Sequence, residues 1–395
     1  MADVGQSCCP TQSIEVPGQL GYNADHYWNP GCPMLYSLAR PLLFSLPEEH
    51  SHELTLAMLR KRAGKLWPGS VPASPREVMG IEFPNPVGLA AGLDKNGDCI
   101  DGLADLGFGF IEVGTVTPRP QPGNPQPRLF RLPKAQALIN RMGFNNPGAD
   151  AMVERLSKQK ANRWASVPVA INLGKSKITP NEQADQDYAG TLERLWEFAD
   201  LFVVNVSSPN TPNLRELQEG SELDRILTAC NAVNSRLAKS ASANPKPLLV
   251  KVSPDLSDGQ LTAVADTAIA QGCAGIVATN TTTARPAEDK VMNQSGGLSG
   301  KPLRGRSTEV IHLLYAHTNG ALPIVGVGGI SDIESAWEKI GAGASLLQLY
   351  SALVFEGPGV NKAINKGHLE LMYRLRMPGN TIGFIGNHLT CCRGS

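Results

Sequence analysis

The chain has 395 residues, of which 42% are hydrophobic and 18% charged, which allows a large domain with a smaller appendage and disfavours global disorder. Lysine plus arginine and aspartate plus glutamate number 36 each, so a net charge of zero gives no general attraction to nucleic acid. The eight cysteines form no CxxC pair and no Cys/His ligand spacing, which favours reduced thiols over a disulfide framework or a metal site.

The first 75 residues differ in character from the rest of the chain. The first twenty residues are polar and lack the charged-then-apolar order of a signal peptide, and residues 1–29 are expected to form a poorly ordered tail. Residues 30–75 are expected to form a small helical domain. No run in the sequence reaches the roughly 18 to 20 apolar residues that span a bilayer, so no transmembrane helix is expected.

Two helices are predicted inside this small domain. Residues 34–46 are apolar with one arginine, and Pro41 is expected to kink or split any helix there. Residues 47–66 begin with Pro47, have acids in the first turn and end with bases, as helix ends favour. Such a pair of helices could dock on a membrane surface or bind an apolar ligand, or it could simply pack as a cap on the neighbouring domain. Composition alone favours the structural cap.

From residue 85 onward, a short apolar run, a polar turn and a helix-like segment follow one another repeatedly. The helix-like segments include 150–160, 188–199 and 221–238, the last with Ser221 as its expected N-cap. The apolar runs do not alternate with polar residues, which is typical of parallel strands buried on both faces. There are eight such runs, at 85–91, 110–117, 167–174, 201–209, 247–254, 275–282, 323–330 and 346–353.

This alternation predicts an α/β fold: a (β/α)8 TIM barrel over residues 76–380, preceded by the small N-terminal helical domain and followed by a tail over 381–395. A doubly wound open sheet is the rival, but its GxGxxG phosphate turn occurs nowhere in the chain. Residues 118–148 are rich in proline and glycine. They are expected to form a folded loop or a short β excursion over the barrel mouth.

Polar residues or bare glycines stand at the end of every predicted strand. Because barrels of this kind carry their chemistry at the carboxyl ends of the strands, these residues describe one lined pocket. In strand order they are Asp94 and Lys95; Thr115; Asn172; Asn205, Ser207 and Ser208; Lys251; Asn280 and Thr281; Gly328 and Gly329; and Tyr350 and Ser351.

Three features of this rim point to specific chemistry. The glycines of GVGG (326–329) would expose backbone N–H groups that suit a phosphate dianion, or would only form a tight turn. Lys251 lies inside an apolar strand, so its ammonium must meet an anion or a large polar ligand, either a flavin ring or a carboxylate elsewhere in the chain. Lys95 follows small residues and could bind a substrate carboxylate, or could be a surface lysine at a helix start.

Ten motifs resemble, in the same order, those of dihydroorotate dehydrogenases, over about residues 78 to 375. Serine in SSPNT, together with an N-terminal extension of this length, resembles the class 2, quinone-linked branch, since the class 1 enzymes carry cysteine there. The motifs are NPVGLAAGLDKNG (85–97), GFGFIEVGTVTPRPQPGNPQPRLFRLP (107–133), INRMGFNN (139–146), INLGKSK (171–177), VVNVSSPNT (203–211), VKVSPDL (250–256), TNTT (279–282), GGLSGKPL (296–303), PIVGVGGI (323–330) and LLQLYSAL (346–353).

The resemblance implies an FMN enzyme that oxidises (S)-dihydroorotate to orotate in de novo pyrimidine (UMP) biosynthesis, with ubiquinone as the final electron acceptor. It implies FMN contacts at Ala90, Ala91, Gly92, Asp94, Gly114, Thr115, Asn140, Asn172, Asn205, Lys251, Thr279, Gly300, Gly328, Gly329, Tyr350 and Ser351. It implies substrate contacts at Lys95, Asn140, Arg141, Met142, Gly143, Phe144, Asn205, Ser207, Asn210, Asn280 and Thr281.

The resemblance also implies that Ser208 is the base that takes the C5 proton, with Thr211 and an ordered water as its relay. Free serine is a poor base and no histidine is adjacent, so it needs such help. The loop at 212–220 is expected to close over the site. Asn213 stands where many members have glycine, and Pro212 precedes it, which puts the loop motion in doubt. Thr115 stands where serine is frequent, a mild departure.

The N-terminal helices receive a role from the same resemblance, which reverses the preference for a simple cap. Residues 30–70 would form a quinone tunnel, with Arg131 and Tyr350 at its inner end, on the surface of the mitochondrial inner membrane as a peripheral protein. The expected partners are dihydroorotate, orotate, ubiquinone and that membrane surface, without metal or nucleic acid. The bases expected near anionic head groups, each worth about 1 kcal/mol, are Arg60, Lys61, Arg62 and Lys65.

Two rival functions remain open at this point. A soluble flavin dehydrogenase of a related dihydropyrimidine, using fumarate or a nicotinamide, would not need residues 1–75. A non-catalytic barrel that binds a phosphate ligand would be colourless, whereas a flavoprotein is yellow.

Overall fold

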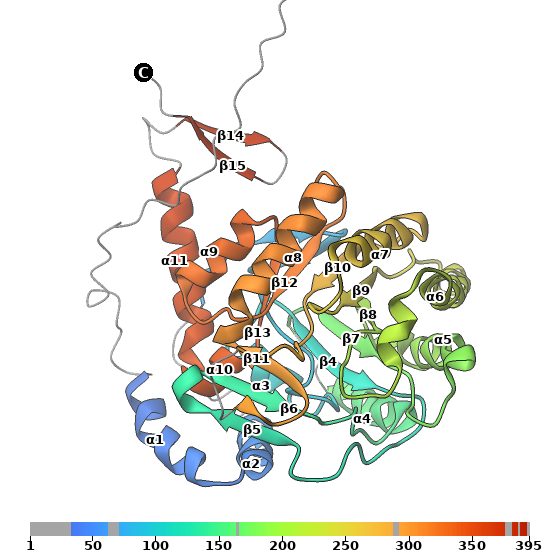
Figure 1. Cartoon of the computed structure of the whole chain (residues 1–395), viewed down its shortest axis with the longest axis horizontal. Coiled ribbons are helices and arrows are strands. Elements are labelled where there is room, and N and C mark those ends of the chain that lie inside the picture. Colours follow the sequence, from blue (N-terminus) through green and yellow to red (C-terminus); the bar gives the residue numbers. More distant parts are fainter. Residues whose placement is uncertain are drawn as a thin grey trace, which may run out of the picture.

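The barrel is closed by eight parallel strands in the order β3, β4, β7, β8, β9, β10, β12 and β13, which confirms the predicted TIM barrel (Figure 1). The computed structural model describes residues 33–61, 71–162, 166–286, 292–375, 381–385 and 388–392. Each predicted run contains one strand: β3 Val87–Leu89, β4 Ile111–Val116, β7 Val169–Leu173, β8 Leu201–Asn205, β9 Leu248–Val252, β10 Gly275–Ala278, β12 Ile324–Val327 and β13 Leu346–Leu349.

The strands are buried on both faces, as their non-alternating sequences predicted. Every residue of β4, β7, β8 and β9 is buried. One face of each strand points into the barrel and the other packs against the ring of helices, so apolar side chains are favoured at nearly every position. Among the described cysteines, Cys99, Cys230 and Cys273 are free and buried, in agreement with the expected reduced thiols.

Helices follow the strands around the outside of the barrel (Figure 1). The predicted N-cap of the helix after β8 was wrong: α6 begins at Gly220, so Ser221 lies inside it and Glu219 is the N-cap. A 3-10 turn, η5 (Leu214–Gln218), leads directly into this helix and fixes its start. The helices are α3 Ile100–Ala104, α4 Ala149–Asn162, α5 Ala184–Leu195, α6 Gly220–Ser240, α7 Asp258–Ala270, α8 Arg304–His317, α9 Ile333–Gly341, α10 Ser351–Phe355 and α11 Gly359–Leu375, with further 3-10 turns η2 Pro133–Ala135, η3 Asn181–Gln183, η4 Trp196–Phe198 and η7 Lys301–Leu303.

A short hairpin that the sequence analysis missed closes the amino end of the barrel. Strands β1 (Arg76–Val78) and β2 (Ile81–Phe83) pair antiparallel before β3 begins. The ring of Phe83 packs edge-on against Phe110, with centroids 5.3 Å apart. Both rings belong to an apolar cluster with residues near the start of the barrel strands, including Leu201 and Leu346. This end is therefore filled with side chains, which leaves the opposite end for ligands.

The proline- and glycine-rich region forms the predicted β excursion over the barrel mouth. Strands β5 (Leu129–Leu132) and β6 (Ala137–Asn140) pair antiparallel. A third strand, β11 (Gly297–Gly300), pairs with β6 and places Gly297 opposite Asn140. This third strand comes from a segment far along the chain. Its residues belong to the motif GGLSGKPL (296–303), which was not predicted to be a strand.

The small N-terminal domain consists of two helices, α1 (Pro33–Ser45) and α2 (Glu48–Lys61), in the described part of residues 30–75. Helix α2 has the predicted acids in its first turn and bases in its last. Helix α1 continues through Pro41, so the predicted split is not seen. Figure 1 shows both helices beside β5, on the side of the barrel mouth.

The C-terminal segment differs from the expected tail. Strands β14 (Thr381–Ile385) and β15 (His388–Cys392) pair antiparallel as a hairpin. The expected disorder of residues 1–29 lies outside the described residues, as do Arg62 and Lys65.

Candidate active site

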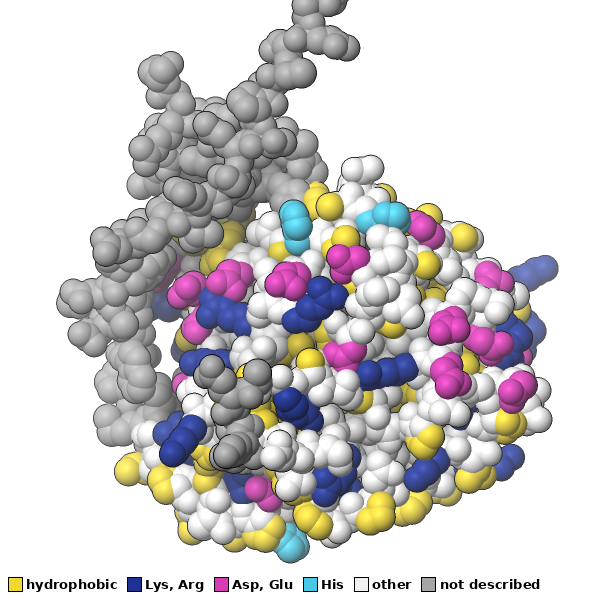
Figure 2. All heavy atoms as spheres, in the orientation of Figure 1, with side chains coloured by type: hydrophobic (Ala, Val, Ile, Leu, Met, Phe, Trp, Pro, Cys, Tyr) yellow, Lys and Arg dark blue, Asp and Glu magenta, His cyan; other side chains and the backbone are white. Residues whose placement is uncertain are grey.

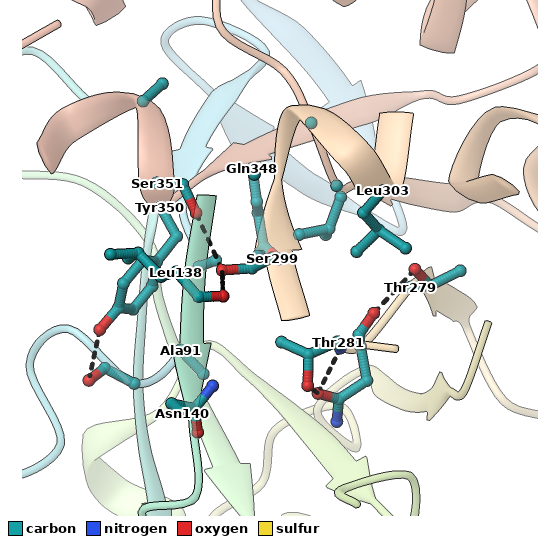
Figure 3. A pocket seen from close by; sticks show the side chains of 18 of the residues that line it. Ala91, Leu138, Asn140, Thr279, Thr281, Ser299, Leu303, Gln348, Tyr350 and Ser351 are labelled. Carbon is teal, nitrogen blue, oxygen red and sulfur yellow. Dashed lines mark hydrogen bonds between the residues drawn. The ribbon is translucent and has the colours of Figure 1, made fainter. Parts of the chain in front are cut away.

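A pocket opens at the carboxyl ends of the barrel strands, where the sequence analysis placed it. Its wall combines residues after the strands with residues of the β5–β6–β11 sheet, such as Leu138 and Ser299, and with His52 of α2. Figure 3 shows side chains from these separate parts of the chain, among them Asn140, Thr281 and Tyr350, around one space. The pocket thus joins the barrel, the small sheet and the N-terminal helices.

A network of amides forms one wall of the pocket. Asn280 Nδ2 donates to Asn205 Oδ1 at 3.2 Å and to Ser207 Oγ at 3.0 Å. Asn205 Nδ2 in turn donates to Thr115 Oγ1 at 3.0 Å. Across the pocket, Asn210 Nδ2 donates to Asn140 Oδ1 at 2.9 Å. Amides present both donors and acceptors, so this wall suits a planar ring that carries N–H and C=O groups.

Ser208 presents a hydroxyl to the same pocket. Its Oγ accepts a hydrogen bond from the backbone N–H of Asn210 at 3.3 Å, and it is 6% exposed. Thr211 lies three residues further on and its Oγ1 is buried without a partner among the described residues. A buried hydroxyl without a protein partner is a place where an ordered water is expected. The two hydroxyls therefore fit the predicted proton relay.

Lys95 also lines the pocket. Its Nζ donates to Asn145 Oδ1 at 2.5 Å. Burial of the ammonium and the nearby charge of Arg128 together lower the pKa of Lys95 to about 7, although Glu49 opposes the shift. Burial and the charge of Lys95 also lower the pKa of His52 to about 4. An anionic ligand would restore a favourable environment for the Lys95 charge.

Lys251 meets a carboxylate that the sequence analysis left unidentified. Its Nζ lies 3.4 Å from Oε1 of Glu112, the second residue of β4, which is fully buried. Glu112 also accepts hydrogen bonds from Asn172 Nδ2 at 2.5 Å and from Gln348 Nε2 at 2.6 Å. The carboxylate of Glu112 thus partly balances the buried ammonium of Lys251, which also lines the pocket.

Glycines form a cradle at the end of the pocket next to β12. Gly329 has a φ of +71°, and a Cβ on it would lie 2.6 Å from the Cα and 2.7 Å from the backbone N of Arg304. Gly328 and Gly300 also have positive φ, at +124° and +97°. The hydroxyl of Ser351 is nearby, 3.0 Å from Ser299 Oγ. Bare backbone and hydroxyls in this arrangement fit a phosphate group, which needs close N–H and O–H donors.

Asn213, the departure in the loop after Ser208, adopts a left-handed conformation with φ 57° and ψ 5°. Glycine and asparagine are the residues that tolerate this region best, so asparagine can replace the more frequent glycine. The loop is held by Asn181 Nδ2, which donates to the Asn213 carbonyl at 3.0 Å, and by an ion pair of 3.0 Å between Arg215 and Asp255.

Most of the predicted site residues line this pocket. They are Ala90, Ala91, Gly92, Lys95, Thr115, Asn140, Met142, Gly143, Phe144, Asn205, Ser208, Asn210, Lys251, Thr279, Asn280, Thr281, Gly300, Gly328, Gly329, Tyr350 and Ser351.

Several predicted residues are not part of the pocket wall, and some of them make hydrogen bonds that support it. The Asp94 carboxylate accepts backbone N–H groups of residues 96, 98 and 99, and burial raises its pKa. Asn172 donates to Glu112, and Ser207 Oγ donates to Asn205 Oδ1 at 3.2 Å. The others outside the wall are Gly114 and Thr211.

The two predicted arginines, Arg131 and Arg141, are not among the residues that line the pocket. Arg141 stacks over Phe130 at 4.6 Å and donates to Gln294 at 3.1 Å. Arg131 donates to the carbonyls of Leu43, at 3.0 Å, and Leu46 at the end of α1. Arg131 therefore fastens β5 to the helix pair, and the pocket wall as described does not include it.

The polar residues at or behind the pocket wall that the sequence analysis missed include Glu112, Gln348, Asn145 and His52. One signal could have revealed Glu112, because it interrupts the apolar strand FIEV just as Lys251 interrupts PLLV. A buried acid and a buried base in one barrel are expected to pair. His52 had no signal, since its contact with the pocket depends on how α2 packs.

Comparisons with known proteins point to one family. The family model for dihydroorotate dehydrogenase matches residues 75–372. The chain is 52% identical over 338 residues to a dihydroorotate dehydrogenase (quinone) of Gloeobacter violaceus, covering 84% of this chain and 92% of that protein. It is 52% identical over 334 residues to the enzyme of the same description from Thiobacillus denitrificans, covering 83% and 97%. The crystal structure of Eimeria tenella DHODH in complex with ferulenol matches with a TM-score of 0.78 and 36% identity, covering 82% and 92% of the two chains.

Proposed function

The chain belongs to the dihydroorotate dehydrogenase family, and we propose the following assignment of roles within it. The protein is an oxidoreductase that converts dihydroorotate to orotate in pyrimidine synthesis and passes the electrons to a quinone. The observation that carries the residue assignment is the convergence of Lys95, Ser208 and four asparagine amides on one pocket. These groups match a ring with one carboxylate, several amide edges and one proton to be removed.

The flavin of this family is proposed to be FMN. The glycine cradle and Ser351 suit a single phosphate group, and Ala90, Ala91 and Gly92 leave room for a flat ring against the backbone. Lys251 would stabilise negative charge on the reduced ring. When bound, the flavin supplies the acceptor for the hydride that leaves C6 of the substrate.

The substrate is proposed to bind between Lys95 and the amide wall. Lys95 pairs with the carboxylate of dihydroorotate, displacing the hydrogen bond to Asn145. Asn140, Asn205, Asn210 and Asn280 orient the ring through their amides. The contacts predicted for Arg141 are not part of this proposal, because that side chain points toward Gln294.

Ser208 is proposed to take the proton from C5 of the substrate on its Oγ. The backbone N–H of Asn210 supports this oxygen, and the hydroxyl proton that Ser208 already carries would pass to a water held at Thr211 Oγ1 as the C5 proton arrives. The loop around Asn213 is proposed to close over this end of the pocket when substrate binds and to exclude bulk water.

The helix pair is proposed to admit the quinone and to rest on a membrane. Leu38 and Leu42 of α1 are 73% and 70% exposed, and Leu54 and Met58 of α2 are also largely exposed. Figure 2 shows hydrophobic side chains along the edge of the molecule where Figure 1 places these helices. Such an apolar face is costly in water and favourable in a lipid interface.

The mitochondrial location expected from the resemblance is not carried further. The curated relatives named above are bacterial, so only association with a quinone-containing membrane is proposed. Among the described helices, none is both long and apolar enough to cross a bilayer.

Anaerobic mixing tests the proposed function. The purified yellow protein is mixed with dihydroorotate, which is expected to bleach the flavin absorbance, and a ubiquinone analogue is then expected to restore it. A colourless protein would favour the phosphate-binding barrel. Bleaching followed by reoxidation with fumarate or a nicotinamide, but not with quinone, would favour the soluble dehydrogenase.

The role of Ser208 is tested by two substitutions. Ser208→Ala is expected to slow flavin reduction by at least about 100-fold while the flavin stays bound. Ser208→Cys is expected to retain a base and to shift the pH profile of reduction toward the lower pKa of a thiol. Near-normal reduction in Ser208→Ala would remove Ser208 from its role.

A further inference from the structure

Glu112 is a buried acid that the proposed mechanism does not use. It is the second residue of β4, and its carboxylate accepts hydrogen bonds from Lys251, Asn172 and Gln348. Three donors from three different strands thus meet at this one side chain. Its two oxygens are divided between the neighbours: Oε1 faces Lys251 and Asn172, and Oε2 faces Gln348.

This arrangement fixes the orientation of the Gln348 amide. Because a carboxylate can only accept, the nitrogen of Gln348 must face Glu112, at 2.6 Å, and its oxygen must face away. Gln348 is 2% exposed and lines the pocket, and its Oε1 has no hydrogen-bond partner among the described residues. Figure 3 shows Gln348 among the side chains around the pocket, near Ser351.

An unpartnered buried acceptor is costly. Leaving such an oxygen unsatisfied destabilises a protein, so a donor is expected in the functional state. The same carboxylate that orients this acceptor also holds the Lys251 ammonium at 3.4 Å. The chain therefore presents one acceptor and one cation to the pocket, coupled through a single buried acid.

We propose that Gln348 Oε1 accepts the N3–H of the flavin ring and that Glu112 is the positioning residue that aims Gln348 and Lys251 together at the pyrimidine edge. The oxidised isoalloxazine ring carries a single N–H, at N3, between two carbonyl groups. An acceptor beside a cation is complementary to such an edge, since the cation binds a neighbouring carbonyl oxygen. This inference rests on the proposed flavin function.

A flavin analogue methylated at N3 tests the inference directly, because it lacks the hydrogen in question. The holoenzyme is stripped of flavin and titrated with FMN and with N3-methyl-FMN, following flavin fluorescence. The wild-type protein is expected to prefer FMN by at least about 10-fold, as a site built to bind an N–H rejects the analogue that lacks it. Gln348→Ala, which removes the acceptor and makes room for the methyl group, is expected to reduce this preference to about twofold or less.

A matched control is available at the protein surface. Gln271 Nε2 also donates to a carboxylate, that of Asp224 at 2.6 Å, but far from the pocket wall. Gln271→Ala is expected to keep the wild-type preference for FMN. A loss of preference in both variants would show a general loosening of the fold and would overturn the assignment to Gln348.

Glu112→Gln tests the positioning role with a readout that packing alone would not move. The new amide can donate to Gln348 Oε1, so the Gln348 amide is free to turn and the preference for FMN over the analogue is expected to fall. Lys251 also loses its counter-charge, so the midpoint potential of the bound flavin is expected to become more positive. An unchanged potential together with unchanged preference would overturn the role of Glu112.

The remaining outcomes separate this inference from the function on which it rests. A yellow wild-type protein that binds both flavins equally well would overturn the N3 contact and leave the enzyme assignment intact. A protein that binds neither flavin would overturn both. Should Glu112→Gln fail to fold, the comparison of Gln348→Ala with Gln271→Ala still decides the contact, and an unchanged preference in Gln348→Ala would refute it.

Discussion

The charge of Lys95 is expected to control the binding of orotate across the neutral pH range. Burial and the charge of Arg128 lower the pKa of this lysine to about 7, against an ordinary value of 10.5. The ammonium is therefore present below pH 7 and is lost as the pH rises through that value. Since the neutral amine cannot pair with a carboxylate, affinity for orotate is expected to fall in the same range.

The size of the effect follows from the protonated fraction. With a pKa of about 7, that fraction is about 0.9 at pH 6 and about 0.03 at pH 8.5, so the dissociation constant of orotate is expected to rise about 30-fold. The orotate carboxylate stays ionised throughout this window. His52, the other nearby titrating group, has a pKa of about 4 and stays neutral.

Perturbation of the flavin absorbance by orotate, titrated at several pH values, measures this dependence. Lys95→Arg is the matched control, because a guanidinium remains charged at every pH used and should give a nearly flat profile. Lys95→Gln is expected to bind weakly and without pH dependence. If the wild-type dissociation constant changes by less than about twofold between pH 6 and 8.5, the reasoning is refuted. Loss of the charge from a group with this pKa would produce a much larger change over that range.

Substitutions at three further positions probe the backbone and the buried charge around the site. Asn213→Val is expected to destabilise the protein by about 1–2 kcal/mol, because a β-branched residue resists the left-handed region, whereas Asn213→Gly should stay within about 0.5 kcal/mol; chemical denaturation distinguishes them. Gly329→Ala places a Cβ against the Arg304 backbone at a positive φ. It is expected to weaken FMN binding, measured by flavin fluorescence, by at least about 10-fold. An unchanged affinity would show that the glycine cradle is not the phosphate site. Burial lowers the pKa of Lys339, whose Nζ donates to the Arg304 carbonyl and Thr308, to about 7 from 10.5. The unfolded chain then binds the extra proton, so wild-type stability should fall as the pH decreases from about 10 to 7, and Lys339→Met should show a smaller change in Tm between pH 9 and pH 7.

Local signals in the sequence were sufficient for the barrel. Each barrel strand could be predicted because a strand buried on both faces needs an unbroken apolar run. LFVV and PLLV are two such runs. The rule that chemistry lies at the carboxyl ends of such strands then brought Lys95, Ser208 and Asn280 to one rim. The resemblance added their roles, which periodicity could not supply.

Contacts between distant segments were beyond this kind of prediction. Strand β11 pairs with β6 across more than 150 residues, and its sequence GLSG has no strand signal of its own. The first residue of α6 was predicted wrongly because the 3-10 turn before the helix determines where it begins. The capping preference of Ser221 does not. In both cases tertiary packing overrode the local preference.

The sequence alone determined which segments become the eight barrel strands, which residues stand at their ends, and that Lys251 needed an anion or a large polar ligand. Only closure of the barrel decided that this anion is Glu112, which lies 139 positions away along the chain, and that Gln348, 236 positions from Glu112, shares the same carboxylate. The physical reason is that hydrophobic periodicity reports on neighbours along the chain. The pairing of a buried charge depends on which strands the closed ring places across from one another.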